Sequence, residues 1–407
     1  MKVRSGAYTE FFVSAGGLPL FSTFFLWAFG TGAVQLARPL FAASFGVPVL
    51  LISLVTSSNA VARLVTAPIT GFLMDRWGRR PLLIVGVVLR GVSALLEFFC
   101  QDYLQFLVLE FIGGIGVSIW ATGSNILIGD VSSRENRGMA VAVRSVSVKL
   151  GTILGPIVGG LIAAAFVNLE TGLRWIFIFN AATKVIMLVI LLLHVRETRP
   201  QAEPAPAVGD IRRTGSFDPS LFWNRPFLAV AAATLAISTM GSGVVQALFP
   251  VFTERVVGLA TYDIGVMMTL AGVTSMLISF PNGWLIDRLG HRASLAPGLL
   301  VLALSASLLA ISDTYWAVVV MVLVYGLGDG MSQGASQAYA IDLAPEQRRG
   351  AFLGVWSLLQ NGGTIIAAVL VGAAVDRLGY GAAFHGTAVF LVLSALLFWV
   401  FGTAKRH

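Results

Sequence analysis

Long apolar stretches recur along the whole of this 407-residue chain. A helix that crosses a bilayer needs about 20 consecutive, mostly apolar residues, and about twelve stretches of that length can be placed here. Charged residues make up only 12% of the chain, whereas a soluble domain carries roughly 25%. Such a chain cannot cover a water-facing surface. We therefore expect an all-α membrane protein with about twelve transmembrane helices, each close to the length that the bilayer thickness requires.

The stretches are rich in leucine, valine, alanine, isoleucine and phenylalanine, with many glycines. They are too long and continuous for the alternating segments of about ten residues that form an outer-membrane barrel. Glycine is expected in such helices, because small residues let neighbouring backbones approach closely in lipid. The predicted helices cover residues 18–42, 48–70, 81–100, 104–128, 139–166, 174–195, 226–252, 262–282, 293–312, 314–340, 350–373 and 382–403.

Lysine and arginine are distributed unequally between the loops on the two sides of these helices. Short cytoplasmic loops of membrane proteins carry an excess of both residues. The poorer side has only Arg174, Arg255 and Arg377, so we predict a multi-pass protein of the inner (cytoplasmic) membrane with both termini cytoplasmic. The richer side carries Arg76, Arg79, Arg80, Arg134, Arg137, Arg288, Arg292, Arg348, Arg349, Lys405 and Arg406.

The longest polar segment lies in the middle of the chain. Residues 197–225 contain four prolines and the pair Arg212 and Arg213. A proline-rich polar composition favours a flexible linker over a folded domain. We therefore predict an N-terminal six-helix bundle over 1–196, a cytoplasmic linker over 197–225, and a C-terminal six-helix bundle over 226–407.

The two halves of the sequence repeat each other at a fixed offset. Residues 71–80 (Gly-Phe-Leu-Met-Asp-Arg-Trp-Gly-Arg-Arg) match residues 283–292 (Gly-Trp-Leu-Ile-Asp-Arg-Leu-Gly-His-Arg) at six of ten positions, an offset of 212 residues. The same offset relates Asp130 to Asp342. Many secondary transporters are built from repeated halves with a binding site at the repeat interface. We therefore interpret the chain as a duplication.

These segments resemble the major facilitator superfamily. Residues 71–80 are similar to its signature between the second and third helices. Residues 342–350 (Asp-Leu-Ala-Pro-Glu-Gln-Arg-Arg-Gly) are typical of its connection between the tenth and eleventh helices. The resemblance covers essentially the whole chain. It implies two pseudo-symmetric six-helix bundles and a monomeric transporter of small molecules.

Charged residues of the signature suggest a latch between cytoplasmic helix ends. By resemblance, Asp75 faces the amino end of the eleventh helix, where the backbone dipole favours a carboxylate by about 0.3–1 kcal/mol. Arg79 or Arg80 would pair with Asp130, and Gly71 would let two helix ends touch. The alternative is that these arginines only set the topology. The residues assigned to the motif are Gly71, Asp75, Arg76, Gly78, Arg79, Arg80, Asp130, Gly283, Asp287 and Arg288.

A second motif lies in the fifth predicted helix, where residues 151–160 read Gly-Thr-Ile-Leu-Gly-Pro-Ile-Val-Gly-Gly. Pro156 removes a backbone hydrogen bond and bends the helix. Gly155, Gly159 and Gly160 make a flat face for close packing. The segment resembles the antiporter motif of drug–proton exporters in the superfamily, although Ala142 stands where that motif has glycine. The alternative is a packing kink with no bearing on the direction of transport.

Ionisable side chains within the predicted helices are candidate functional residues, because a charge in lipid costs roughly 2.5–3.5 kcal/mol. The resemblance implies that the first, fourth, seventh and tenth helices line a central cavity, and Lys149 of the fifth helix is a further candidate. The residues assigned to substrate or proton binding are Gln35, Arg38, Glu110, Lys149, Gln246 and Asp329.

Glu110 stands where many exporters of the superfamily carry an arginine, so that arginine's role does not transfer. A buried glutamate can itself bind and release a proton, or it forms a structural ion pair, for example with Arg38. Asp329 has no counterpart in the first half, where Val117 occupies the related position, and this favours a functional role. The sequence assigns no role to Arg90 or Lys184.

Two functions fit these patterns. The fifth-helix motif and the embedded carboxylates favour proton-coupled efflux of small amphipathic molecules or drugs by alternating access. Embedded basic residues outnumber acidic ones, which favours a carrier for an anionic metabolite or lipid-like amphipath, including an importer.

Residue patterns for other chemistry are missing from the sequence. One cysteine cannot form an intrachain disulfide, and the four histidines have no metal-ligand spacing. There is neither a nucleophile–base constellation nor a Walker-type loop. We therefore expect that the protein is not an enzyme and that it binds no cofactor, metal or nucleic acid. The expected partners are a small-molecule substrate, protons and the lipid bilayer.

Overall fold

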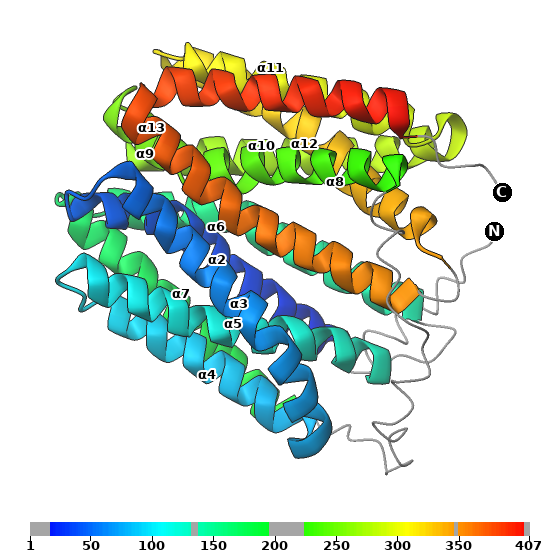
Figure 1. Ribbon diagram of the computed structural model, residues 1–407. Helices are drawn as coiled ribbons and strands as arrows, with labels where there is room; N and C mark the ends of the chain where they lie inside the picture. Colours follow the sequence, from blue (N-terminus) through cyan, green and yellow to red (C-terminus); the bar gives the residue numbers. More distant parts are fainter. Residues whose placement is uncertain (1–16, 132–136, 195–223, 346–348, 403–407) are drawn as a thin grey trace. The chain divides into compact units, whose positions relative to one another are not determined.

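The computed structural model describes residues 17–131, 137–194, 224–345 and 349–402. Every regular element in these ranges is helical (Figure 1). Nearly all of the predicted linker and both chain ends lie outside them. The predicted cytoplasmic placement of the termini therefore remains a prediction.

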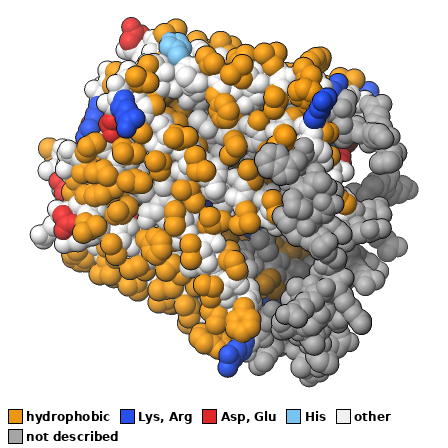
Figure 2. All heavy atoms as spheres, viewed as in Figure 1, with side chains coloured by type: hydrophobic (Ala, Val, Ile, Leu, Met, Phe, Trp, Pro, Cys, Tyr) orange, Lys and Arg blue, Asp and Glu red, His pale blue; other side chains and the backbone are white. Residues whose placement is uncertain are grey.

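Nine helices in the described ranges are long and apolar enough to cross a membrane. The all-helical membrane class is thus confirmed, while this criterion does not establish the predicted number of spans. Hydrophobic side chains dominate the described part of the surface seen in Figure 2. Large apolar residues such as Phe72, Phe280 and Trp316 are more than half exposed. Such a surface suits hydrocarbon better than water.

The first-half helices begin and end within about five residues of their predicted positions, except that α3 continues from the predicted residue 70 to Trp77. In α4, the positively charged first turn precedes the apolar stretch, so the helix begins before it. The helices are α2 (Gly17–Ser44), α3 (Val49–Trp77), α4 (Arg79–Glu97), α5 (Tyr103–Val131), α6 (Arg137–Ala164) and α7 (Leu169–His194).

One second-half prediction needs correction, because the single helix predicted over 226–252 is interrupted by the π-helix η3. The element α13 contains the two helices predicted over 350–373 and 382–403, which a kink at Gly379 (φ 83°) separates. The elements are α8 (Arg225–Ser238), η3 (Thr239–Gln246), α9 (Phe249–Arg255), α10 (Thr261–Leu289), α11 (Arg292–Ala310), α12 (Tyr315–Leu343) and α13 (Arg349–Phe401).

The contacts divide the chain into two compact units that do not follow the midpoint of the sequence. The segments that depart from it are 48–57 and 260–269, which the 212-residue offset relates to each other. The first turns of α3 therefore pack in unit 2, and those of α10 pack in unit 1. Unit 1 comprises Met1–Val47, Ser58–Arg199 and Ala260–Thr269, and unit 2 comprises Pro48–Ser57, Pro200–Leu259 and Leu270–His407.

Matching contacts hold these two exchanged segments. The Ser57 hydroxyl donates to the carbonyl of Ile365 over 3.2 Å, and the Thr269 hydroxyl donates to the carbonyl of Ile153 over 2.8 Å. The two donors, Ser57 and Thr269, are 212 residues apart in the sequence, and so are the two acceptors, Ile153 and Ile365. The duplication thus preserves hydrogen bonds within the units as well as sequence motifs.

In unit 2 a carboxylate from α13 also binds the exchanged segment 48–57. Asp376 accepts from the backbone N–H groups of Val49 and Leu50 over 2.9 and 2.8 Å. The first amides of a helix have no partner within the helix, and a negative charge there is favourable. Asp376 therefore caps the amino end of α3.

The glycine face of α6 packs on α2, as the fifth-helix motif predicts. A Cβ atom at Gly155 would lie 2.6 Å from the backbone nitrogen of Ala33, and one at Gly159 would lie 3.1 Å from its carbonyl oxygen. Backbone atoms cannot rotate away as a side chain can. Glycine at these positions is thus needed for the observed approach of the two helices.

Glycine is also required in the turn after α3. Gly78 has φ 93° and its repeat counterpart Gly290 has φ 81°, a region that residues with a Cβ rarely occupy. Gly71 differs, because no described atom lies within 4 Å of the position its Cβ would take. The close helix contact expected at Gly71 is therefore not found in this part of the structure.

We predict opposite effects for two glycine substitutions in helices. Gly155→Ala should lower the free energy of unfolding by about 1–3 kcal/mol, because the added methyl group collides with backbone. Gly354→Ala adds its methyl group where no described atom lies within 4 Å. It should leave stability unchanged or raise it by up to about 1 kcal/mol, because alanine favours helix. Thermal unfolding in detergent would measure both, and equal effects would contradict the packing role of Gly155.

Candidate functional site

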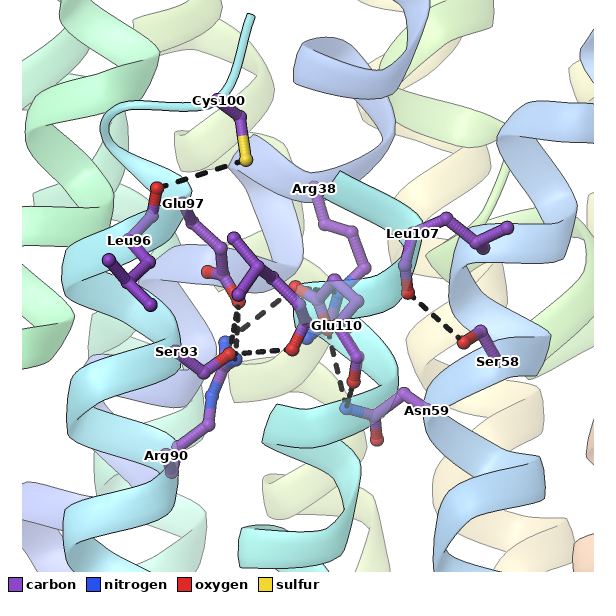
Figure 3. A network of polar contacts seen from close by, with 11 residues as sticks. Arg38, Ser58, Asn59, Arg90, Ser93, Leu96, Glu97, Cys100, Leu107 and Glu110 are labelled. Atoms are coloured by element: carbon purple, nitrogen blue, oxygen red, sulfur yellow. Dashed lines mark hydrogen bonds and ion pairs between the residues drawn. The ribbon is translucent and has the colours of Figure 1, made fainter. Parts of the chain in front are cut away.

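A network of buried charges joins α2, α4 and α5 in unit 1 (Figure 3). Arg38 Nε lies 2.9 Å from Glu110 Oε1, and Arg90 Nη1 lies 2.7 Å from Glu97 Oε1. Arg90 Nη2 also lies 3.6 Å from Glu110 Oε1. The side chains of Arg90, Glu97 and Glu110 are fully buried. Two arginines and two glutamates therefore share one enclosed site.

Helical spacing assembles one side of this network. Arg90, Ser93 and Glu97 are three and four residues apart on α4, so they lie on the same face. Opposite them, Gly113 on α5 leaves the space that the guanidinium of Arg90 occupies, since a Cβ there would collide with Arg90 Nη1. The sequence thus makes room for the arginine between two helices.

Asn59 of α3 extends the network. Its Nδ2 donates to Glu110 Oε2 over 3.3 Å and lies 3.4 Å from the Glu110 carbonyl oxygen. Removing one member of a buried ion pair leaves an uncompensated charge and costs about 3–5 kcal/mol. The four charged groups consequently hold one another in place.

Lys184 on α7 is a different kind of buried cation. Its Nζ donates to the carbonyl oxygen of Trp27 over 3.1 Å and lies 4.7 Å from the centre of the Trp27 ring. The residue is 1% exposed. Within the described residues no carboxylate lies at ion-pair distance from it. The carbonyl oxygen and the aromatic face of Trp27 therefore surround the amino group of Lys184.

Unit 2 carries its own embedded carboxylate. The Ser275 hydroxyl donates to Asp329 Oδ2 over 2.6 Å, and Gln333 Nε2 donates to Asp329 Oδ1 over 3.2 Å. Asp329 is half-buried on α12. These are neutral donors, so this site differs from the arginine-rich network of unit 1.

The structure brings some of the predicted site residues together and leaves others apart. Arg38 and Glu110 form the ion pair that was one of the two alternatives for Glu110. Gln35 is half-buried, while Lys149 and Gln246 are exposed; Gln246 ends the π-helix η3.

The sequence analysis missed Asn59, Ser93 and Glu97 as site residues and left Arg90 without a role. A usable signal was present, because an arginine and a glutamate seven residues apart in one apolar helix lie on the same face. Asn59 carried no such signal, since its contact with Glu110 joins two helices.

The signature residues are only partly visible. The side chains of Asp75 and Asp130 lie outside the described residues, so the latch stays a hypothesis. Arg80 donates to the carbonyl of Leu192 over 2.8 Å. In the second half, His291 Nε2 lies 2.8 Å from Asp342 Oδ2, at positions that the repeat relates to Arg79 and Asp130.

Two charged residues of the second copy of the signature, Asp287 and Arg288, are exposed. Asp287 lies at the surface, and the Arg288 guanidinium lies 4.3 Å from the centre of the Trp284 ring. Such a contact contributes about 0.5–1 kcal/mol at an exposed site.

The fold and the conserved spacing of the halves agree with comparisons to known proteins. The sequence model of the Major Facilitator Superfamily matches residues 20–276 and 231–407. The chain belongs to this superfamily. Its members are transporters and not enzymes, so the chain is a multi-pass membrane transporter.

Relatives and solved structures of the superfamily cover most of the chain. Multidrug resistance protein 1 of Bacillus subtilis is 24% identical over 324 residues, 78% of this chain and 78% of the relative. Quinolone resistance protein NorA of Staphylococcus aureus is 23% identical over 365 residues, 88% and 89% of the two chains. The crystal structure of a D-xylose-proton symporter superposes with a TM-score of 0.76 at 19% identity, covering 95% and 97%. The last likeness shows the fold alone.

Cys100 lies beside the ion network, just beyond the end of α4. Burial raises the pKa of its thiol to about 11. Because the thiolate is the reactive form, the thiol is protonated and slow to react near neutral pH.

We predict that Cys100 reacts slowly with a maleimide at pH 7.5 and that the rate rises about tenfold per pH unit below its pKa. The matched control is Gln101→Cys in a Cys100→Ser background, which places a thiol at the exposed neighbouring position. The control should react at least about tenfold faster at pH 7.5, because an ordinary thiol pKa is about 8.5. Equal rates would contradict the burial of Cys100.

A second prediction concerns Lys184. Lys184→Met removes a buried charge and keeps an unbranched side chain of similar length, so stability in detergent should be unchanged or higher. Thermal unfolding would test this, with Lys149→Met at an exposed position as control. A marked loss of stability specific to Lys184→Met would show that its contacts with Trp27 outweigh the cost of burial.

Proposed function

We propose that this transporter exports small amphipathic molecules, including drugs, in exchange for protons, by alternating access of two six-helix bundles in the inner membrane. Twelve spans, with α13 counted as two and α8, η3 and α9 as one, and cytoplasmic termini belong to this proposal. The observation that carries it is that each unit embeds a carboxylate, Glu110 or Asp329, within an apolar helix. The relatives named for multidrug and quinolone resistance support the substrate class.

Each carboxylate has partners that depend on its charge. Glu110 faces Arg38 and Arg90, which favour its ionised form, whereas Asp329 accepts from Ser275 and Gln333. Gaining a proton would weaken these contacts and change the relative stability of two conformations. Proton binding and conformational change are coupled in this way.

The fifth-helix motif supports the proposed exchange of substrate for protons. Gly155 and Gly159 bring α6 against α2, the helix that carries Arg38. A bend at Pro156 would therefore act on a helix of the ion network.

A second candidate is a carrier for an anionic metabolite or lipid-like amphipath, including an importer. Lys149 is exposed, and Arg63 and Arg144 also lie within the helices. These cations favour an anionic substrate. Selective movement of anions would support this alternative.

The test is transport in proteoliposomes under an imposed pH gradient, with panels of cationic dyes and anionic amphipaths. For one-for-one exchange, one pH unit supports about a tenfold concentration ratio of substrate. We predict that the wild type concentrates cationic dyes and that Glu110→Gln and Asp329→Asn each abolish concentration while downhill movement remains. Asp313→Asn, at an exposed position, is the matched control and should behave as the wild type.

Two outcomes would overturn the proposal. Wild-type movement that ignores the pH gradient would remove proton coupling. Full concentration by both carboxylate variants would place the coupling sites elsewhere.

A further inference from the structure

Glu97 is a fully buried carboxyl at the end of α4 that the proposed mechanism does not use. It lies on the far side of Arg90 from Glu110, so one guanidinium stands between two carboxyl groups (Figure 3). The two carboxyl groups have different surroundings, and this difference indicates where a proton is held.

The hydroxyl of Ser93 has one hydrogen to donate, but two oxygen atoms lie within hydrogen-bond distance of it. Its Oγ lies 2.6 Å from the carbonyl oxygen of Leu109 and 2.9 Å from Glu97 Oε1. A hydroxyl donates one hydrogen, a carbonyl only accepts, and an ionised carboxylate only accepts. Ser93 therefore cannot satisfy both oxygens at once.

A proton on Glu97 resolves this shortage. Ser93 then donates to Leu109, at the shorter distance, and accepts from Glu97 Oε1. The same Oε1 still accepts from Arg90 Nη1 at 2.7 Å. Every short contact around Ser93 then has one donor and one acceptor.

The second oxygen of Glu97 leads to the same assignment. Among the described residues Glu97 Oε2 has no hydrogen-bond partner and is buried. A buried charged oxygen without a partner is costly, and a neutral carboxyl reduces that cost. Glu110 Oε1 likewise has no hydrogen-bond partner among the described residues. Glu110 nevertheless differs, because two guanidinium groups lie 2.9 and 3.6 Å from Oε1 and Asn59 donates to Oε2 over 3.3 Å.

We propose that Glu97 is a proton-binding residue of the transport cycle, protonated in this conformation, while Glu110 is ionised between the two arginines. This inference rests on the proposed proton coupling and deepens it. Loss of the proton from Glu97 changes the network from a net charge of +1 to zero. The bond that breaks is the carboxyl O–H, the proton goes to water, and the new carboxylate draws Arg90 away from Glu110.

The end of α4 that carries Glu97 borders a pocket, although Glu97 itself does not line it. A cavity of about 540 Å³ lies between the end of α4 and the start of α5, and Asp102 and Gln105 supply polar side chains to it. Leu109, whose carbonyl faces Ser93, also lines it. Leu96 and Phe99, which flank Glu97 in the sequence, line the same pocket.

The charged and titratable groups around Glu97 come from several elements. On α4 and α5 these are Arg90 and Glu110, and Arg38 reaches the network from α2. Near the end of α4 are Cys100, Asp102 and, from α7, Arg174, which donates to the carbonyl of Phe98. Lys184 of α7 lies near enough to Arg90 for the two side chains to interact electrostatically.

Difference infrared spectroscopy of the purified full-length protein tests the protonation state directly. A titration should show the carbonyl stretch of a buried, protonated carboxyl group at neutral pH, shifted by deuterium exchange. The band should be absent in Glu97→Gln and changed in frequency in Glu97→Asp. Glu170→Gln, at an ion pair that is partly exposed to solvent, is the control. A band that persists unchanged in Glu97→Gln and Glu97→Asp, or no band in the wild type, would overturn the assignment.

Transport separates this inference from the proposed function. If the wild type couples to the pH gradient, Glu97→Gln should retain downhill movement, lose concentration of substrate, and flatten the pH profile of transport. Full proton-driven concentration by Glu97→Gln would overturn a role in the cycle. A wild type that does not couple to protons would overturn the proposed function and the cycle role together, while the infrared band would still report the protonation of Glu97.

Discussion

Hydrocarbon offers no hydrogen-bond partners, and the rest of this structure depends on that constraint. Backbone groups inside a membrane must bond within the protein, which leaves helices as the elements of a chain with these apolar stretches. Side chains obey the same rule. Thr31 and Thr66 donate to the carbonyls four residues earlier in their own helices, over 2.8 and 2.6 Å. A single backbone carbonyl cannot compensate the cost of burying a charged side chain. Arg90 and Glu97 instead form an ion pair with each other.

The two halves share a backbone plan but differ in buried chemistry. The turn glycines Gly78 and Gly290 both have positive φ, and the exchanged segments 48–57 and 260–269 make matching hydrogen bonds. These features fix the path of the backbone, which is similar in the two halves. The ion network has no such repeat: the positions related to Arg90, Glu97 and Glu110 are Leu302, Leu309 and Val322.

This difference gives each unit its own electrostatic character. Unit 1 compensates its buried carboxyl groups with arginines, whereas unit 2 surrounds Asp329 with a hydroxyl and an amide. Unit 2 also interrupts a predicted helix with η3, and π-helical turns are frequent at functional sites. The two carboxylates Glu110 and Asp329 thus differ in the contacts described above: guanidinium groups face the first, and a hydroxyl and an amide donate to the second.

The sequence by itself determined the helical membrane class, the duplication and its offset, the superfamily, and the packing face of Gly155 and Gly159. These follow from hydropathy, spacing and small-residue patterns, which are local. Only the tertiary structure decided that Arg90 belongs between Glu97 and Glu110, that Asn59 joins them, and that η3 breaks its helix. Arg90 and Glu97 share one helix, but Glu110, Arg38 and Asn59 come from other helices, and their distances depend on how those helices pack. A one-dimensional pattern does not contain that information.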